Sequence, residues 1–162
     1  MPLPTLSILP SLIILGAVAC VAAALALRRH PNVDFNEHAT TRIFASAIGI
    51  QAIHFIEEAA TGFHERFPAV FGANAMPLSW FAAFNLLWLA YWAISVTGLK
   101  HSRRNAFFAA WFLALAGMLN AIAHPVLALL ANGYFPGLVT SPIIGAFSYW
   151  LWRSLHRSTS RS

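Results

Sequence analysis

Residues 43–63 read IFASAIGIQAIHFIEEAATGF, an apolar stretch interrupted near its end by His54, Glu57 and Glu58. Its length is close to the ~20 residues that a helix needs to cross the hydrocarbon core of a bilayer. Ionisable side chains are costly inside a membrane, so those that occur there indicate a functional site by default. This stretch therefore predicts a membrane-spanning helix and also the place where the chemistry occurs.

The rest of the chain has the same character. The protein has 162 residues, of which 59% are hydrophobic and 9% are charged, whereas soluble domains carry roughly 25% charged residues. We expect residues 1–162 to form a single domain, an all-α polytopic membrane bundle of about five transmembrane helices. The predicted spans are about 6–27, 42–62, 77–99, 105–131 and 138–152.

The basic residues predict the orientation of this bundle. With five spans, nine of the ten Lys and Arg residues fall on one side, and Arg66 alone falls on the other. The positive-inside rule then places the N-terminus outside and the C-terminus in the cytoplasm. Arg outnumbers Lys nine to one, which is typical of GC-rich bacterial genomes, so we expect a multi-pass protein of the bacterial cytoplasmic (inner) membrane. The nine residues are Arg28, Arg29, Arg42, Lys100, Arg103, Arg104, Arg153, Arg157 and Arg161.

Other classes of function are disfavoured. The net charge of +5 comes from residues that flank apolar segments, and no basic patch interleaved with aromatic residues indicates nucleic-acid binding. Cys20 is the only cysteine, so the sequence predicts neither a disulfide framework nor a thiolate metal cluster. Small residues in span 6–27 permit close helix packing, as a scaffold or as a homo-oligomer contact.

Polar residues of separate spans converge on one depth. At ~1.5 Å rise per residue, His54 lies roughly 18 Å above Arg42, and His124 lies roughly 28 Å above the start of its own span. Both positions fall in the outer third of the bundle. His54 and Glu58 are four residues apart and share a helix face, as do Asn120 and His124. Two spans therefore present short polar stripes at the same level.

A metal ion best explains this combination, because two adjacent carboxylates in a low-dielectric environment need neutralisation. His54, Glu58 and His124 form the set of two histidines and one carboxylate that suits a catalytic zinc with an open position; iron is the alternative metal. Glu57 is the expected base or a further carboxylate ligand. Asn120 is expected to orient His124.

Two more polar residues lie at this depth. Asn85 is the amide of span 77–99, and Thr140 opens the last span from the same side. Both are expected to support the site from outside the ligand set. For Asn85 and Asn120, hydrogen bonding between helices is the alternative role.

Three ordered blocks of sequence carry a family resemblance. His54-Phe-Ile-Glu57-Glu58 followed by Gly62-Phe63, then Asn120-Ala-Ile-Ala-His124, then Tyr134-Phe-Pro136-Gly137-Leu-Val-Thr140, resemble the HXXEE-motif family of small bacterial integral membrane proteins. The resemblance covers the second to fifth spans. The family is named for its motif, so the resemblance implies a site and not an activity. It also draws attention to Tyr134, as a catalytic hydrogen-bond donor or substrate gate, or as part of a plain connecting turn.

Three functions remain open. The favoured one is a metal-dependent hydrolase that attacks an ester or amide bond in a lipid-like or amphiphilic substrate. The second is metal-free acid–base isomerisation of a sterol- or isoprenoid-like molecule. The third is transport or sensing of a cation or of protons, which is disfavoured because such sites usually lie at the membrane midplane. The expected partners are membrane lipid and a lipid-like small molecule, and no nucleic acid.

Overall fold

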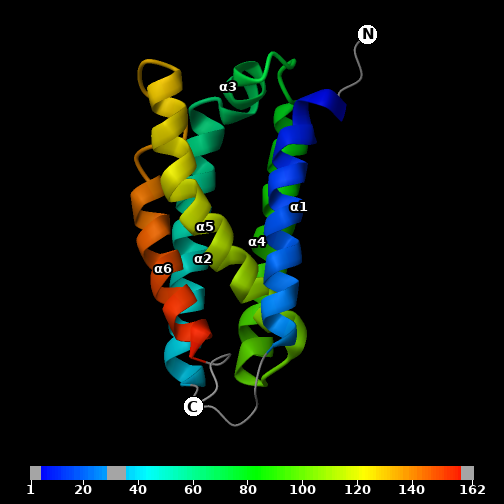
Figure 1. Ribbon diagram of the computed structural model, residues 1–162, viewed down its shortest axis with the longest axis vertical. Coiled ribbons are helices and arrows are strands. Elements are labelled where there is room, and N and C mark those ends of the chain that lie inside the picture. The colour runs from blue at the N-terminus through cyan, green and yellow to red at the C-terminus, as the bar shows by residue number, and fades with distance from the viewer. Residues whose placement is uncertain (1–4, 29–35, 158–162) are drawn as a thin grey trace.

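The computed structural model describes residues 5–28 and 36–157, and every regular element in these two ranges is an α-helix (Figure 1). The helices stand side by side along one long axis, except for the short α3, which lies across one end. The helices are α1 (Thr5–Leu27), α2 (Glu37–Ala60), α3 (Phe63–Val70), α4 (Leu78–Lys100), α5 (Arg104–Leu130) and α6 (Ser141–His156).

Three helices, α2, α4 and α5, are long and apolar enough to cross a membrane, which indicates a membrane protein. They correspond to the predicted spans 42–62, 77–99 and 105–131. The described apolar part of α1, Leu12–Leu27, is shorter, and α6 has 16 residues. The count of five spans therefore stays a prediction.

Helix α2 begins five residues before the expected span, at Glu37. The side chain of Asn36 accepts a hydrogen bond from the backbone N–H of Ala39 at 2.9 Å, so it caps an otherwise unpaired donor of the first turn. Glu37 adds a negative charge next to the positive end of the helix dipole. These two polar residues extend the helix beyond the apolar run.

Helix α3 lies between the predicted spans 42–62 and 77–99, where no helix was predicted. Gly62, with φ of +83°, makes the turn between α2 and α3, a conformation that glycine adopts without steric cost. Phe63 and Phe67 then stack with ring centroids 5.0 Å apart, and Phe67 packs in a small core with Leu127 and Phe135. This end of the bundle is therefore covered.

Helix α5 is the centre of the fold. It crosses the bundle diagonally, from α1 and α4 near its start to α6 near its end (Figure 1), and it packs against all three. The first half of α5 is almost completely buried, with Phe107, Trp111 and Leu113 fully enclosed. Toward its second half, α5 leans away from α1 and α4, and the side chains there line a cavity.

Small residues allow α5 and α6 to approach closely. A Cβ atom built at Gly117 would overlap the side chain of Ser148, and one built at Gly145 would overlap Ala121. Glycine and other small residues are the usual contacts between closely packed membrane helices. This contact fixes α6, and with it the loop before α6, against the second half of α5.

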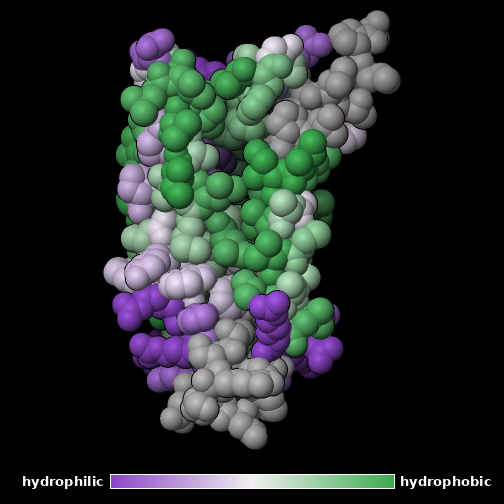
Figure 2. All heavy atoms as spheres, viewed as in Figure 1, coloured by the Kyte–Doolittle hydropathy of each residue, from purple (hydrophilic) through white to green (hydrophobic). Residues whose placement is uncertain are grey.

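The helices alternate in direction, so the charged segments meet at one end (Figure 1). Figure 2 shows hydrophilic residues gathered at the lower end, below a largely hydrophobic surface. Arg66, in α3, is at the opposite end. Arg29 and Arg161 lie outside the described residues. This segregation matches the sequence pattern, whereas which end faces the cytoplasm stays a prediction.

Candidate metal centre

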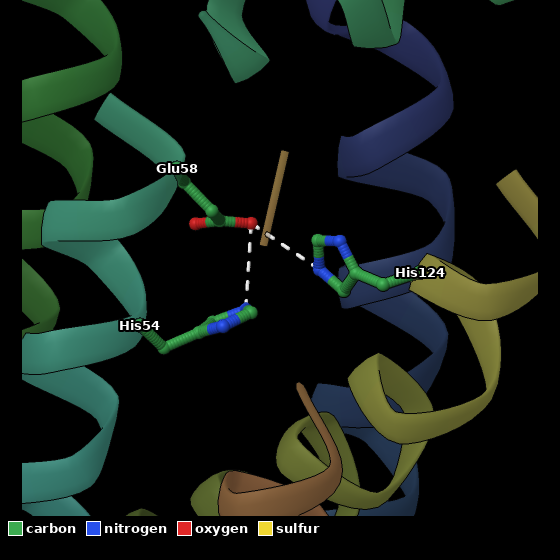
Figure 3. Close-up of side chains that lie close together, drawn as sticks. All are labelled: His54, Glu58 and His124. Carbon is green, nitrogen blue, oxygen red and sulfur yellow. Dashed lines mark ion pairs between the residues drawn. The ribbon is translucent and has the colours of Figure 1, made fainter. Parts of the chain in front are cut away.

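His54 and Glu58 of α2 and His124 of α5 point toward one another (Figure 3). Glu58 Oε1 lies 3.5 Å from His54 Nε2 and 3.4 Å from His124 Nε2. All three potential ligand atoms lie within 4.8 Å of one another. The three residues are 0%, 7% and 2% exposed, respectively. The structure thus brings together the three residues predicted to hold the metal.

Helix geometry explains the meeting. His54 and Glu58 stand one turn apart on the face of α2 that points into the bundle, and both are buried. His124 comes from α5, which runs in the same direction as α2, and it reaches the same level from the other side (Figures 1 and 3). The depth estimate from the sequence is therefore consistent with the position of the three side chains.

The loop between α5 and α6 sets the tautomer of His124. Its Nδ1 lies 2.6 Å from the backbone oxygen of Pro136. A carbonyl oxygen only accepts hydrogen bonds, so Nδ1 carries the proton. In the neutral ring, Nε2 then holds a lone pair, and this is the nitrogen that faces Glu58.

Thr140 does the same for His54. The Thr140 hydroxyl donates a short hydrogen bond to Glu57 Oε2, so its oxygen accepts at 2.7 Å from Nδ1 of His54. The second imidazole therefore also turns an unprotonated Nε2 toward Glu58. Histidines that bind metals usually donate their other ring N–H to a carbonyl, a carboxylate or similar group. Both rings are held in this way.

Two nitrogen lone pairs and a carboxylate oxygen thus face one another in a buried space. Within the described part of the chain, no Lys or Arg pairs with Glu58. Three acceptors without a shared cation or proton repel one another. Two ligands at 2.0–2.1 Å from a tetrahedral zinc lie about 3.4 Å apart, and the two distances to Glu58 Oε1 are 3.4 and 3.5 Å. The donor set fits zinc, and so does the spacing of each imidazole nitrogen from Glu58 Oε1, while all three atoms lie within 4.8 Å of one another.

Glu57 points elsewhere, although the sequence predicted it as the base of the same site. Its Oε1 accepts from the Tyr134 hydroxyl at 2.7 Å and from the Val139 N–H at 3.0 Å. Its Oε2 accepts from the N–H of Thr140 at 2.8 Å and from the Thr140 hydroxyl. Four donors therefore occupy this carboxylate. The arrangement favours a role for Glu57 in holding the 134–140 loop over a role as the base.

Tyr134, predicted as a catalytic donor or gate, contacts Glu57 and not the three ligand residues. Its backbone oxygen accepts a hydrogen bond from Arg66 of α3 at 3.1 Å. Burial, with the hydrogen bond to Glu57 and the charge of Glu57 as weaker causes, raises the pKa of the Tyr134 phenol above its ordinary value. The phenol therefore stays protonated and remains a donor at neutral pH.

Gly137 brings the loop backbone directly onto the two histidines. Its φ of +86° lies in the left-handed region that favours glycine. A Cβ atom added there would come within 2.7 Å of His124 Nδ1 and 2.9 Å of His54 Cε1. The sequence indicated only a turn at Gly137 and Pro136. The contact with the histidines joins residues far apart in the chain, and no local signal reveals it.

The two predicted supporting amides lie in different surroundings. Asn120 Nδ2 lies 3.3 Å from His54 Nε2, so it contacts His54 of the neighbouring helix and not His124, which it was expected to orient. A metal bound to His54 would replace this long hydrogen bond. Asn85 donates to the backbone oxygen of Phe81 at 2.9 Å, and it reaches the site only through the cavity that both amides line.

That cavity has a volume of about 440 Å³ and adjoins Glu58 and His124. Residues of five helices, α1 to α5, form its wall. Most are aromatic or aliphatic. The polar members are Gln51, Glu58, Asn85, Asn120 and His124. Apolar cavities with a few converging polar groups are the usual form of small-molecule sites.

Comparisons with known proteins give no relative: no protein-family model, no curated protein and no solved structure matches this chain.

Proposed function

We propose that this protein is a metal-dependent membrane hydrolase that acts on a lipid-like or amphiphilic substrate. One observation carries the proposal: His54 Nε2, His124 Nε2 and Glu58 Oε1 converge in a buried space with both imidazoles oriented by hydrogen bonds at Nδ1. Zinc is the favoured metal because two histidines and a carboxylate leave one position open for water or substrate. Iron uses a similar ligand set.

The roles of the chain's own residues follow from their contacts. A zinc ion in such a site supplies an activated water for hydrolysis. Thr140 and the carbonyl of Pro136 hold the imidazoles with Nε2 inward. Glu57 and Tyr134 fix the loop that carries both of these groups. The largely apolar cavity supplies room for the substrate.

The location belongs to the same proposal. Five spans, with the N-terminus outside and the C-terminus in the cytoplasm, put the metal centre in the outer third of a bacterial cytoplasmic membrane. The segregation of basic residues supports this orientation. Membership of the HXXEE-motif family is likewise proposed, on the three sequence blocks that meet at the site.

Metal content tests the proposal. The full-length protein is purified in detergent without chelators, and bound metal is quantified by elemental mass spectrometry. We expect about one zinc or iron per chain, which His54→Ala, Glu58→Ala and His124→Ala each remove. His38→Ala is the matched control, because His38 is an exposed histidine of the same helix α2 at its other end.

A protein without metal, even after reconstitution, would contradict the proposal. The carboxylate of Glu58 would then be balanced by a proton shared with His54 or His124, which lie 3.5 and 3.4 Å away. That result would favour the acid–base isomerase over the hydrolase. Metal retained in all three variants would instead place the ion elsewhere.

A further inference from the structure

The cavity beside the metal centre has the length of one lipid chain. Along α5 the lining residues run from Leu127 to Phe112. The part inward of the metal centre, from His124 to Phe112, covers twelve residues and therefore roughly 18 Å along the helix axis. One leaflet contributes about half of the ~30 Å hydrocarbon core, or ~15 Å. The volume of about 440 Å³ lies in the lower part of the ~300–1,000 Å³ range of ligand cavities. Both dimensions fit one chain better than two.

The wall that α4 contributes is largely aromatic along this length. Trp80, Phe84, Trp88 and Trp92 line the cavity at intervals of four residues along α4, so they form one stripe on that helix. At the inner end, Trp92 and Phe112 form a stacked pair with ring centroids 6.2 Å apart, and Phe112 also stacks on Trp88 at 4.2 Å. An apolar tail would lie against this stripe, with its end at the stacked pair.

Three amides line the same cavity, and two of them lie one helical turn inward from the ligands. Gln51 precedes His54 by three residues, and Asn120 precedes His124 by four. Gln51 makes no hydrogen bond to any described residue, and among those residues the side-chain oxygens of Asn85 and Asn120 also lack donors. Unpaired amides in an apolar cavity are costly, so a bound molecule that hydrogen-bonds to them gains affinity.

We infer that the cavity binds a single-chain amphiphile that carries an O–H or N–H donor a few bonds from its scissile carbonyl, on the chain side. The carbonyl lies at the metal centre, the donor lies one turn inward at the amides, and the tail follows the aromatic stripe. A β-hydroxyacyl or acylamido chain has this order of groups. The inference rests on the proposed function for the position of the scissile bond, and it adds the class of substrate.

Hydroxamic acids test this order of groups, because the hydroxamate binds zinc and the tail is variable. Binding of butano-, dodecano- and β-hydroxydodecanohydroxamic acid is measured by calorimetry on the zinc-loaded protein in lipid nanodiscs, with empty nanodiscs as the partition control. We expect the β-hydroxy compound to bind roughly threefold to tenfold more tightly than its unsubstituted analogue, as for one added hydrogen bond.

Two variants test the tail-binding part and the amide-lined part of the cavity separately. Ala116→Phe fills the middle of the cavity, so it should weaken both long-chain compounds at least tenfold and leave the short one unchanged. Gln51→Leu should remove the preference for the β-hydroxyl and leave the zinc content unchanged. Ile94→Phe is the control, because Ile94 is on the same helix as the aromatic stripe but is 74% exposed and outside the cavity.

The outcomes distinguish this inference from the proposed function. The inference is overturned if zinc-loaded wild type binds all three compounds with equal affinity. It is also overturned if Ala116→Phe binds the long-chain compounds as tightly as wild type does. Both results leave the metal centre intact. If the protein binds no zinc, the N-methylamide of the β-hydroxydodecanoyl chain replaces the hydroxamates. If wild type binds this amide and Ala116→Phe does not, the cavity assignment is supported although the hydrolase proposal fails. If wild type does not bind the amide, both are overturned.

Discussion

The hydroxyl oxygen of Thr140 lies 2.7 Å from His54 Nδ1 and donates its hydrogen to Glu57. One side chain therefore links an imidazole of the candidate metal centre to a carboxylate whose two oxygens both face the loop. The adjacent residues Glu57 and Glu58 consequently differ in task. Glu58 faces the two histidines, and Glu57 holds the group that orients one of them.

Replacement of Thr140 by valine tests this link. Thr140→Val keeps the size of the side chain and removes the hydroxyl, so the Nδ1–H of His54 loses its acceptor. We expect zinc affinity to fall by about 10- to 100-fold, which is the usual effect of losing such an orienting partner. The affinity is measured by competition with a chelator of known strength.

Thr97→Val is the matched control for that experiment. The Thr97 hydroxyl donates to a backbone oxygen of its own helix, at Ile94, near the end of α4 away from the site. It should leave zinc affinity unchanged. Equal affinity in wild type and Thr140→Val would show that the hydroxyl does not orient His54.

Glutamine at position 58 should separate metal binding from stability. Glu58→Gln removes the anionic ligand, so we expect it to abolish zinc binding. Its amide N–H groups can donate to the lone pairs of His54 and His124, which are 3.5 and 3.4 Å from Glu58 Oε1. The thermal unfolding midpoint in the presence of chelator should therefore stay equal to that of the wild type or rise. A lower midpoint without metal would contradict this account of three facing acceptors.

Glutamine at position 57, unlike glutamine at position 58, should lower the stability of the protein. Glu57→Gln replaces one carboxylate oxygen by an NH2 group, so at least one N–H or O–H donor of the loop loses its acceptor. The free energy of unfolding should therefore fall by about 1–3 kcal/mol. Amide hydrogen exchange should increase at Val139 and Thr140, whose N–H groups bond to Glu57. Glu65→Gln is the control, because that carboxylate is largely exposed in α3. Unchanged exchange in the loop would show that Glu57 does not hold it.

The membrane helices and the ligand set were predictable for simple reasons. Long apolar runs bounded by charge gave residues close to those of α2, α4 and α5. A spacing of four residues placed His54 and Glu58 on one face, and the rise per residue placed His124 at their depth. These are properties of single helices, so one sequence is enough to derive them.

The remaining features depend on how helices face one another. Adjacent residues of a helix point about 100° apart, so Glu57 and Glu58 do not both face the metal centre, although the sequence assigned both to it. Asn120 was assigned to His124 of its own helix, yet it contacts His54 across the interface. Helix α3 is short and is stabilised by contacts of Phe63 and Phe67 with distant residues, because a helix of eight residues is marginal alone.

The phenol of Tyr134 supplies a prediction about pH. Its pKa is raised in the folded protein, chiefly by burial, so the unfolded state releases this proton at a lower pH than the folded state does. The contribution to stability is then fully present below the ordinary tyrosine pKa of about 10 and is lost as the pH rises through the folded value. The difference in phenolate absorbance between wild type and Tyr134→Phe should show a midpoint above that of free tyrosine. A midpoint at or below it would contradict the burial of the phenol, which is the main cause of the raised pKa.

Alanine at position 137 gives the sharpest test of the loop against the two histidines. Gly137→Ala introduces strain at φ of +86° and also a methyl group within 3 Å of both imidazoles, so zinc binding and thermal stability should both fall. Gly72→Ala shares the positive φ, at +67°, but its Cβ meets no atom within 4 Å, so it should lower stability alone. Gly133→Ala has open space and no positive φ, so it should change neither quantity. If Gly137→Ala lowers stability no more than Gly72→Ala does and keeps full zinc affinity, then the loop does not seat on His54 and His124. In that case the orientation of both rings would need another cause.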